Sequence, residues 1–407
     1  MRILKVSQTY YPYLAAGGPP AKVRGLAKAL VERGNRLTVL TAYQGPLGSL
    51  HDVHRVPWGW SANGDGIEAV YLKTTLRYRS LSVNPGVLRF CQVRLREFDI
   101  VHVYGLYDLL GPAVARYCRQ FGIPYFVEPL GMTRPIDRGF LLKRAWRSLV
   151  NGYLSGASRM VATSEQERSE LLADGFPPER VLLRYNGIDR EEFRQLPPPG
   201  AFRSQAGIGN DERFIIFLGR LIPRKGADLL IEALPQIDGG KTKLVIAGPE
   251  AESGYLAFLR GKARSLGVEH RVLFTGPLYG NDKKAALADA SVFALPSRYE
   301  NFGNAAAEAI ACGTPAIVSD RCGIAPLINQ RAGLVTSYDS GVVARTLNDL
   351  FENASLYQRL KAGCPQVADE ISWGRLVGGM ERSYEEAIDQ FLQRPSVLVA
   401  TGENRTR

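Results

Sequence analysis

The segment Arg213-Phe-Ile-Ile-Phe-Leu-Gly-Arg-Leu-Ile-Pro-Arg-Lys-Gly226 places five consecutive apolar residues directly before a loop of glycines, a proline and three cations. A short apolar run rich in Ile and Phe predicts a buried β-strand at residues 213–218. Gly219, Pro223 and Gly226 then predict a sharp turn. In open α/β sheets ligands bind beside such loops, at the carboxyl ends of the strands.

The alternation of short strands with helical patterns continues on both sides of this segment. Strands are expected at residues 3–7, 36–42, 67–72, 99–104, 124–128, 159–164 and 181–185, and then at 243–247, 271–275, 291–295 and 315–319. A helix at residues 19–33 is expected to end at Gly34. Strands that alternate with helices predict parallel sheets covered on both faces.

A chain of 407 residues is too long for one ordinary hydrophobic core, so two domains are expected. The alternation restarts after Asn186-Gly-Ile-Asp189 and the run Pro197-Pro-Pro199. We therefore place the boundary near residues 187–200, between domains at 1–190 and 200–370.

The composition excludes several classes of protein. Five widely spaced cysteines without a C-x-x-C pair support neither a disulfide framework nor a structural zinc site. No secretory leader and no membrane-spanning run is recognised, so a cytoplasmic protein is expected. The net charge of +11 calls for anionic partners, but the cations are not clustered as in nucleic-acid-binding domains.

Two basic segments have the pattern of helices that lie on a membrane surface. Residues 87–96 and 140–150 interleave cations with large apolar side chains. A packed helix with a solvated basic face is the alternative for each.

The densest group of candidate site residues is Leu295-Pro-Ser-Arg-Tyr-Glu-Asn-Phe-Gly-Asn-Ala-Ala-Ala-Glu-Ala-Ile-Ala-Cys-Gly-Thr-Pro315. The alanines predict a helix from about residue 304, and Gly313 and Pro315 end it. Glu300 then lies in the loop and Glu308 one turn inside the helix, roughly 10 Å apart at 1.5 Å of rise per residue. That distance is too long for a shared proton, so the two carboxylates are expected to contact different parts of one ligand. Solvated helix-end charges are the alternative.

Backbone N–H groups of Asn301, Phe302, Gly303 and Asn304 are expected to face a phosphate or sugar hydroxyls at the helix N-terminus. Arg220 and Lys225, in the loop after residues 213–218, suit a diphosphate, which Arg holds bidentately and Lys as a point charge. A salt-bridged surface turn is the alternative for that loop.

Two further signals are weaker. Gly17 and Gly18 follow the first strand and open a helix, where glycines allow a close approach to an anion or sugar, although such pairs also serve steric needs alone. His102, near the carboxyl end of its strand, either bonds a sugar hydroxyl or is a hydrogen-bonded core histidine. His51 and His54 are expected in a surface loop, and no D-x-D triad offers a handle for a nucleotide-bound cation.

Taken together, these residues resemble the retaining nucleotide-sugar glycosyltransferases of family 4, which have the GT-B fold of two Rossmann-like domains. The resemblance spans nearly the whole chain, from Gly17-Gly18 through Ala162-Thr-Ser-Glu165, Asn186-Gly-Ile-Asp189, Gly219-Arg-Leu, Lys225-Gly226, Val245-Ile-Ala-Gly248 and Phe274-Thr-Gly276 to Glu300 and Glu308. It implies an acceptor-side first domain and a nucleotide-sugar-binding second domain. A helix at residues 371–392 would cross back to the first domain, followed by a disordered tail at 393–407.

The resemblance also implies roles for the candidate residues. Arg220 and Lys225 would bind the donor diphosphate, Glu308 the ribose hydroxyls and Glu300 the donor sugar. Residues 301–304, Gly219 and the Gly17-Gly18 loop would complete the donor site, and His102 would be catalytic, although the family often has H-x-H where this chain has His102-Val-Tyr104.

The substrates follow by the same analogy. The donor would be a UDP-sugar or GDP-sugar, with no further cofactor and no metal. Glu128-Pro-Leu-Gly-Met132 is similar to a segment of members that elongate bacterial surface polysaccharides on polyprenyl-diphosphate acceptors. That implies a saccharide or lipid-linked acceptor at the inner membrane face and no nucleic acid. A sugar-nucleotide epimerase of similar fold and a basic membrane-binding module are the alternatives.

Overall fold

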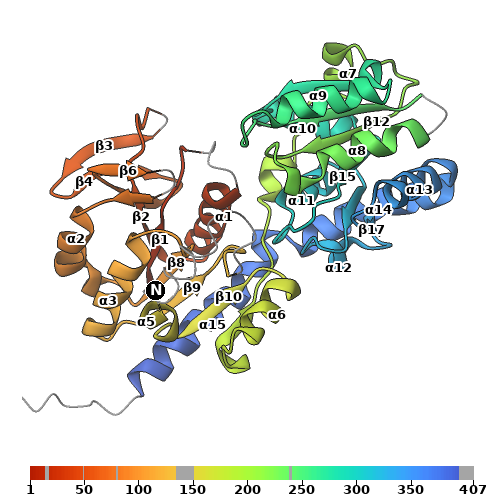
Figure 1. Cartoon of the computed structure of the whole chain (residues 1–407). Helices are drawn as coiled ribbons and strands as arrows, with labels where there is room; N and C mark the ends of the chain where they lie inside the picture. Colours follow the sequence, from red (N-terminus) through yellow and green to blue (C-terminus); the bar gives the residue numbers. More distant parts are fainter. Residues whose placement is uncertain (14–17, 49, 79–80, 134–150, 238–240, 394–407) are drawn as a thin grey trace, which may run out of the picture.

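A computed structural model describes residues 1–13, 18–48, 50–78, 81–133, 151–237 and 241–393 (Figure 1). Gly17, the basic segment 140–150 and the tail from residue 394 lie outside the described residues. The chain forms two α/β units, each built around its own sheet, and Figure 1 shows them side by side.

The first sheet has nine strands within the described residues, in the order β11-β10-β9-β8-β1-β2-β5-β4-β3. Their bounds are β1 (Arg2–Ser7), β2 (Arg36–Ala42), β3 (His51–Val56), β4 (Gly59–Gly64), β5 (Ile67–Leu72), β8 (Ile100–Tyr104), β9 (Tyr125–Glu128), β10 (Arg159–Ala162) and β11 (Val181–Leu183). The seven strands predicted in this half are all present and pair in parallel.

Two antiparallel strands at the edge of this sheet were not predicted. β3 and β4 pair antiparallel, so His51 and His54 lie in a strand and not in a loop. Every residue of β3 is exposed or half-exposed, so this strand has no buried face. Its sequence therefore lacks the alternation of apolar and polar residues that predicts a half-buried strand. A separate hairpin, β6 (Leu76–Tyr78) and β7 (Leu81–Val83), was also missed.

The second sheet has six parallel strands among the described residues, in the order β14-β13-β12-β15-β16-β17. They are β12 (Phe214–Leu218), β13 (Lys243–Ala247), β14 (Val272–Gly276), β15 (Val292–Leu295), β16 (Ala316–Ser319) and β17 (Gly333–Thr336). The sequence predicted the first five and missed the short edge strand β17. The strand order reverses between β12 and β15, and open α/β sheets bind ligands at such a switch point.

Helices cover the sheets and join the two units. In the first unit they are α1 (Gly18–Glu32), α2 (Gly86–Arg94), α3 (Leu110–Phe121), α5 (Asn151–Ser155) and α6 (Glu165–Ala173). In the second they are α7 (Ala201–Ala206), α8 (Ala227–Ala233), α9 (Tyr255–Ser265), α10 (Gly280–Asp289), α11 (Asn304–Ala311), α12 (Ala325–Ile328), α13 (Ser340–Glu352) and α14 (Ala354–Glu370). None of the described helices is long and apolar enough to cross a membrane.

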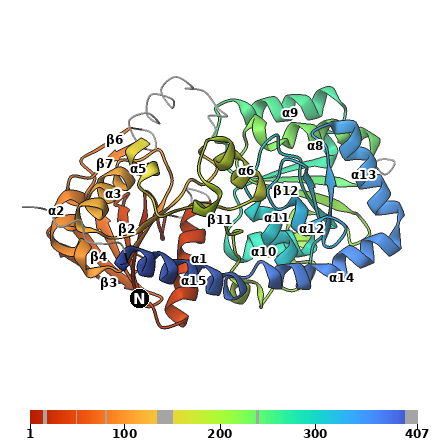
Figure 2. The ribbon, with the colours of Figure 1, turned by 90° about the horizontal axis from the view of Figure 1, so that it is seen from below.

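The last helix, α15 (Trp373–Leu392), returns from the second unit and packs against α1, as Figure 2 shows. Buried Trp373 fills the space between Gly25 and Gly187, where a Cβ atom on either glycine would overlap its indole ring. Further along the helix, buried Val377, Met380 and Tyr384 belong to the apolar core of the first unit. The predicted domain limits at 1–190 and 200–370 stay a prediction.

Candidate functional site

Two loops meet above the switch point of the second sheet. Gly226, in the loop after β12, has a φ of 77°, and a Cβ atom there would lie 2.2 Å from the carbonyl oxygen of Pro296, in the loop after β15. The backbone N–H of Arg298 donates to the carbonyl of Arg224 over 2.8 Å. Only a glycine with left-handed backbone geometry allows so close an approach, so residue 226 sets the contact between the loops.

Lys225 and Glu300 join the same loops through their side chains, which form an ion pair. Burial opposes ionisation of Glu300, but Lys225, Arg224 and Arg220 together hold its pKa below the ordinary value of 4.5. The guanidinium of Arg220 is exposed at the end of β12. The structure therefore gathers three of the predicted site residues, two cations and a carboxylate, into one cluster.

The loop that follows Glu300 is fixed by its backbone. The N–H of Ile324 donates to the carbonyl of Phe302 over 2.7 Å, and the side chain of Phe302 is buried. Gly303, with a φ of 107°, precedes α11, and in the described chain no side chain caps that helix end. The first N–H groups of α11 consequently remain available to an anionic or hydroxyl ligand.

Glu308 lies inside α11, and its carboxylate is 3.0 Å from the ammonium nitrogen of Lys283 in α10. Burial alone would lower the pKa of Lys283, but Glu308 outweighs it and raises that pKa. The two predicted glutamates thus have different basic partners and do not share a proton in this structure.

Side chains of the same loop also contact the first unit. Asn301 donates to the hydroxyl of Thr163 over 2.7 Å and to the carboxylate of buried Glu167 over 3.2 Å. Tyr299 donates to Glu170 over 3.0 Å. The sequence predicted only backbone contacts for residue 301, because the spacing of Thr163 and Glu167 from it in the chain carries no signal.

Gly18 and Gly219 lie at the edges of the candidate site. A Cβ atom on Gly18, the first residue of α1, would lie 2.6 Å from the side-chain nitrogen of Asn304. The side chain of Asn304 accepts a hydrogen bond from Asn186 over 3.0 Å. The N–H of Gly219 donates to the carbonyl of Ala247 over 3.0 Å, which extends the pairing of β12 with β13 into the loop.

His102 lies apart from this cluster, in the core of the first unit. Its ring is fully buried, with Nδ1 2.6 Å from the hydroxyl of Tyr384 in α15 and Nε2 3.5 Å from the carboxylate of Glu128. Burial lowers the pKa of His102 to about 3. Both observations favour the core-histidine alternative over a catalytic role.

Around His102 the structure reveals a buried ionic network that the sequence did not predict. Glu128 pairs with Lys22 and Arg184, and all three side chains are buried. Burial would raise the pKa of Glu128, but Arg184 and Lys22 hold it well below its ordinary range. His102 is hydrogen-bonded to Tyr384 of α15 and lies beside Glu128 of β9, so the network connects α15 to the first sheet.

Comparison with known proteins bears on what this site does. A family model described as "Glycosyl transferases group 1" matches residues 200–366, and one described as a glycosyl transferase 4-like domain matches residues 17–187. An uncharacterised glycosyltransferase of Methanocaldococcus jannaschii is 30% identical over an alignment of 418 positions, gaps included. The alignment covers 96% of this chain and 100% of that protein. A D-inositol 3-phosphate glycosyltransferase of Streptomyces bingchenggensis is 30% identical over 256 residues, 60% of this chain and 56% of that protein.

Among solved structures, the chain is similar to HepE of Anabaena, determined in complex with UDP and glucose. The TM-score is 0.77 at 20% identity, and the match covers 95% of this chain and 100% of that one. At this identity the likeness supports the fold alone, and it confirms the expected GT-B arrangement.

Proposed function

The chain belongs to the group 1 glycosyltransferases, enzymes that use nucleotide sugars, and on that premise we propose a specific reaction for it. It moves a sugar from a nucleoside-diphosphate sugar to a hydroxyl of a saccharide acceptor. The anomeric configuration is retained, and no metal takes part. The observation that carries this proposal is the cluster of Arg220, Lys225 and Glu300 at the switch point of the second sheet.

In this reaction the cations hold the donor diphosphate. Arg220 is exposed at the end of β12, and its guanidinium suits bidentate binding of phosphate oxygens. Lys225 has three N–H donors, so it can bond a phosphate oxygen while it still contacts Glu300. The first N–H groups of α11 add further donors to the same anion.

The two glutamates position the remaining parts of the donor. Glu300 accepts hydrogen bonds from the transferred sugar, and its lowered pKa keeps it ionised for that purpose at neutral pH. Glu308 accepts from the ribose hydroxyls, while Lys283 keeps its carboxylate in place. The nucleotide is of the UDP or GDP type.

The chemical step needs no separate general base. The acceptor oxygen bonds to the anomeric carbon on the face from which the diphosphate leaves, as the bond between that carbon and the diphosphate oxygen breaks. The departing phosphate oxygen takes the acceptor proton. Arg220 and Lys225 stabilise the charge that develops there, which is how fixed cations accelerate such a departure. His102, buried and neutral, takes no part.

We assign the acceptor to the lipid-linked saccharides of bacterial surface polysaccharide or lipopolysaccharide synthesis, at the inner face of the cell membrane. In support, α2 exposes Leu88 and Val93, 50% and 61% accessible, beside the exposed cation Arg89. An apolar and basic surface of this kind binds anionic bilayers. The second basic segment, 140–150, lies outside the described residues.

Two experiments test the proposal. Thermal unfolding with UDP, GDP and ADP, in EDTA, should show stabilisation by one nucleotide without a divalent cation. NMR of the product should show an anomeric bond of the same configuration as the donor. An inverted bond, or a requirement for added metal, overturns the respective part of the mechanism.

Membrane binding has its own test. Flotation with vesicles that contain phosphatidylglycerol should recover the protein, and Leu88→Ser with Val93→Ser should abolish recovery. Leu266→Ser, at an exposed leucine of the second unit, is the matched control. Equal recovery of all variants would remove α2 from the proposed membrane surface.

A further inference from the structure

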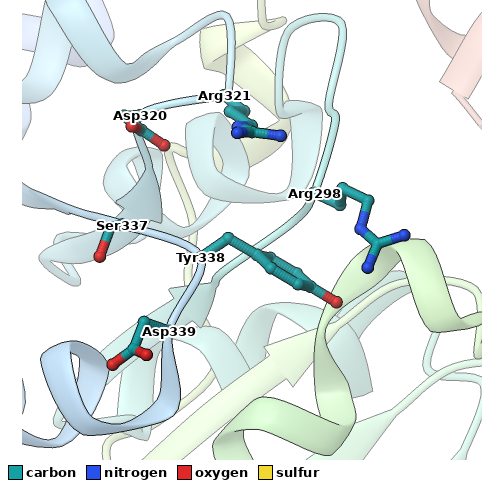
Figure 3. Close-up of a pocket in the computed structure, with 6 residues that line it drawn as sticks. All are labelled: Arg298, Asp320, Arg321, Ser337, Tyr338 and Asp339. Carbon is teal, nitrogen blue, oxygen red and sulfur yellow. The ribbon is translucent and has the colours of Figure 1, made fainter.

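A cavity of about 650 Å³ opens at the carboxyl ends of β15, β16 and β17, beside the loop after β12 that carries Lys225. Six residues from three loops line it, and Figure 3 shows them: Arg298, Asp320, Arg321, Ser337, Tyr338 and Asp339. Its volume falls within the roughly 300–1,000 Å³ of pockets that bind small molecules. None of these residues has a role in the reaction proposed above.

The cavity shares a wall with the sugar end of the donor site. The N–H of Glu300 donates to the carbonyl of Arg321 over 3.0 Å, so Glu300 and Arg321 lie on adjoining strands of backbone. Arg298, on the other side, is two residues before Glu300 in the same loop. A molecule in the cavity would therefore lie beside the loop that carries Glu300.

The polar groups of the lining are of both signs. Arg298, Arg321 and Asp320 are exposed, and within the part of the chain that the structure describes neither guanidinium forms an ion pair. One carboxylate oxygen of Asp339 caps α13 by accepting from the N–H of Val342 over 2.8 Å. Donors and acceptors are thus both present, with two guanidinium groups and two carboxylates.

This combination discriminates between classes of ligand. A phosphate or other anion would meet the carboxylates of Asp320 and Asp339 as well as the guanidinium groups, and like charges repel. An apolar ligand would remove four charged groups from water without giving them partners. Hydroxyl groups both donate and accept, so a polyhydroxylated neutral molecule matches the lining.

The lining also offers a flat surface to a ring. Tyr338 extends across the cavity toward Arg298, whose guanidinium carbon is 5.3 Å from the centre of the tyrosine ring (Figure 3). In this view Asp320 and Arg321 lie above Tyr338, Ser337 to its left and Asp339 below it. A pyranose ring has an apolar C–H face that packs on an aromatic or guanidinium plane, with its hydroxyls directed outward.

We infer that this cavity, although it lies on the second unit, is a subsite for a neutral sugar unit of the acceptor, next to the unit that receives the transferred sugar, while the rest of the acceptor lies on the first domain, as the resemblance implies. The inference rests on the proposed glycosyl transfer, since it takes the acceptor to be a saccharide of at least two units. Asp320 and Arg321 bond its hydroxyls, and Tyr338 with Arg298 packs on its ring.

Ligand-observed NMR on the full chain tests the inference. The probes are maltotriose, cellotriose and mannotriose as neutral saccharides, with digalacturonate and glucose 6-phosphate as anionic ones, each in the presence of UDP and of GDP. Wild type should bind at least one neutral trisaccharide, and Arg321→Ala and Asp320→Asn should each weaken that binding at least about tenfold. The second variant keeps the side-chain volume, so it covers the case in which the first fails to fold.

Arg264→Ala, an exposed arginine of α9 outside the cavity, is the matched control and should bind as wild type does. Binding of anionic probes alone, binding that Arg321→Ala and Asp320→Asn leave unchanged, or no saccharide binding at all overturns the subsite. If wild type is stabilised by a nucleotide in these cases, the subsite alone fails. Without any nucleotide effect, the proposed function fails with it.

Discussion

Lys225 and Glu300 form an ion pair across the loops that follow β12 and β15, the two strands that flank the switch point of the second sheet. In this structure each group neutralises the other. The diphosphate and the sugar of one donor would lie on either side of this pair, which links charge stabilisation to sugar positioning.

Replacement of Lys225 by Met should lower kcat about 100- to 1,000-fold, the usual loss when a group that stabilises developing charge is removed. The same change should raise the pKa of Glu300, because burial is then opposed only by Arg224 and Arg220. A carboxylate whose pKa is lower in the folded chain than in the unfolded one stabilises the fold at pH values above its unfolded pKa, near 4.5. This contribution is lost as the pH falls through the folded pKa. The acidic limb of the activity profile should thus move to higher pH in the variant.

Lys262→Met is the matched control, because Lys262 also pairs with a glutamate, Glu232, but on the outer helices α9 and α8. Initial rates between pH 4 and 8 distinguish the two variants. An unchanged acidic limb in Lys225→Met would show that Glu300 does not depend on this cation.

Substitution of the two glutamates, Glu308 and Glu300, should affect different kinetic and binding constants. Glu308→Gln should raise the Kd of the nucleoside diphosphate about 10- to 100-fold, the value of a lost hydrogen bond to a charged group, and Glu300→Gln should mainly lower kcat. Calorimetric titration with the 2′-deoxynucleotide identifies the contact. Wild type should bind the deoxy form more weakly, and Glu308→Gln should bind both forms equally. Equal discrimination by the two proteins would remove Glu308 from the ribose site.

Much of the second unit could be predicted from the sequence, because its strands are continuous apolar runs and its site residues follow them directly. Gly226 and Lys225 are next to each other in the chain, in the loop that directly follows β12, so their place at the carboxyl end of that strand could be predicted. The cavity residues Arg298, Asp320 and Tyr338 gave no such signal. They come from three loops, and one of these follows β17, a four-residue strand that the sequence pattern did not predict.

Gly226→Ala should separate the two donor loops. A left-handed backbone costs a non-glycine residue about 1–2 kcal/mol, and here the new methyl group would also overlap the carbonyl of Pro296. Gly207→Ala is the control, since its φ of 65° carries the same strain with no atom within 4 Å. Urea unfolding and nucleotide titration should show a small loss of stability alone for Gly207→Ala. For Gly226→Ala they should show a larger loss and nucleotide affinity lowered at least about tenfold. Similar affinities for the two variants would contradict the proposed loop contact.

His102 should affect stability and leave the pH dependence of the chemical step unchanged. Its pKa is about 3 in the folded chain and 6.5 when exposed, so the unfolded chain takes up a proton as pH falls below 6.5 while the folded chain does not. Stability should therefore decline toward acid by up to about 1.4 kcal/mol per pH unit, a slope that His102→Gln should lack. Urea unfolding at pH 5, 6 and 7 measures both slopes. Equal slopes in the two proteins would contradict a neutral, buried histidine.

The histidine also shows where sequence reasoning reached its limit. His102 was placed correctly within a strand, although it is the central residue of β8 and not near its end, and its neighbours Tyr384 and Glu128 are distant in the sequence. The hydrogen bond between His102 and Tyr384 forms only when α15 packs on the first sheet. The sequence therefore left both roles open, and the contacts favour one of them.

The central claim is that a nucleotide sugar is bound and activated by the cluster of Arg220, Lys225 and Glu300. Release of nucleoside diphosphate from a panel of UDP-, GDP- and ADP-sugars, by wild type and by Lys225→Met, tests it most directly. One donor should be consumed by wild type at least about 100 times faster than by the variant. Equal rates for the two proteins, or no release above buffer from any donor, would contradict the claim.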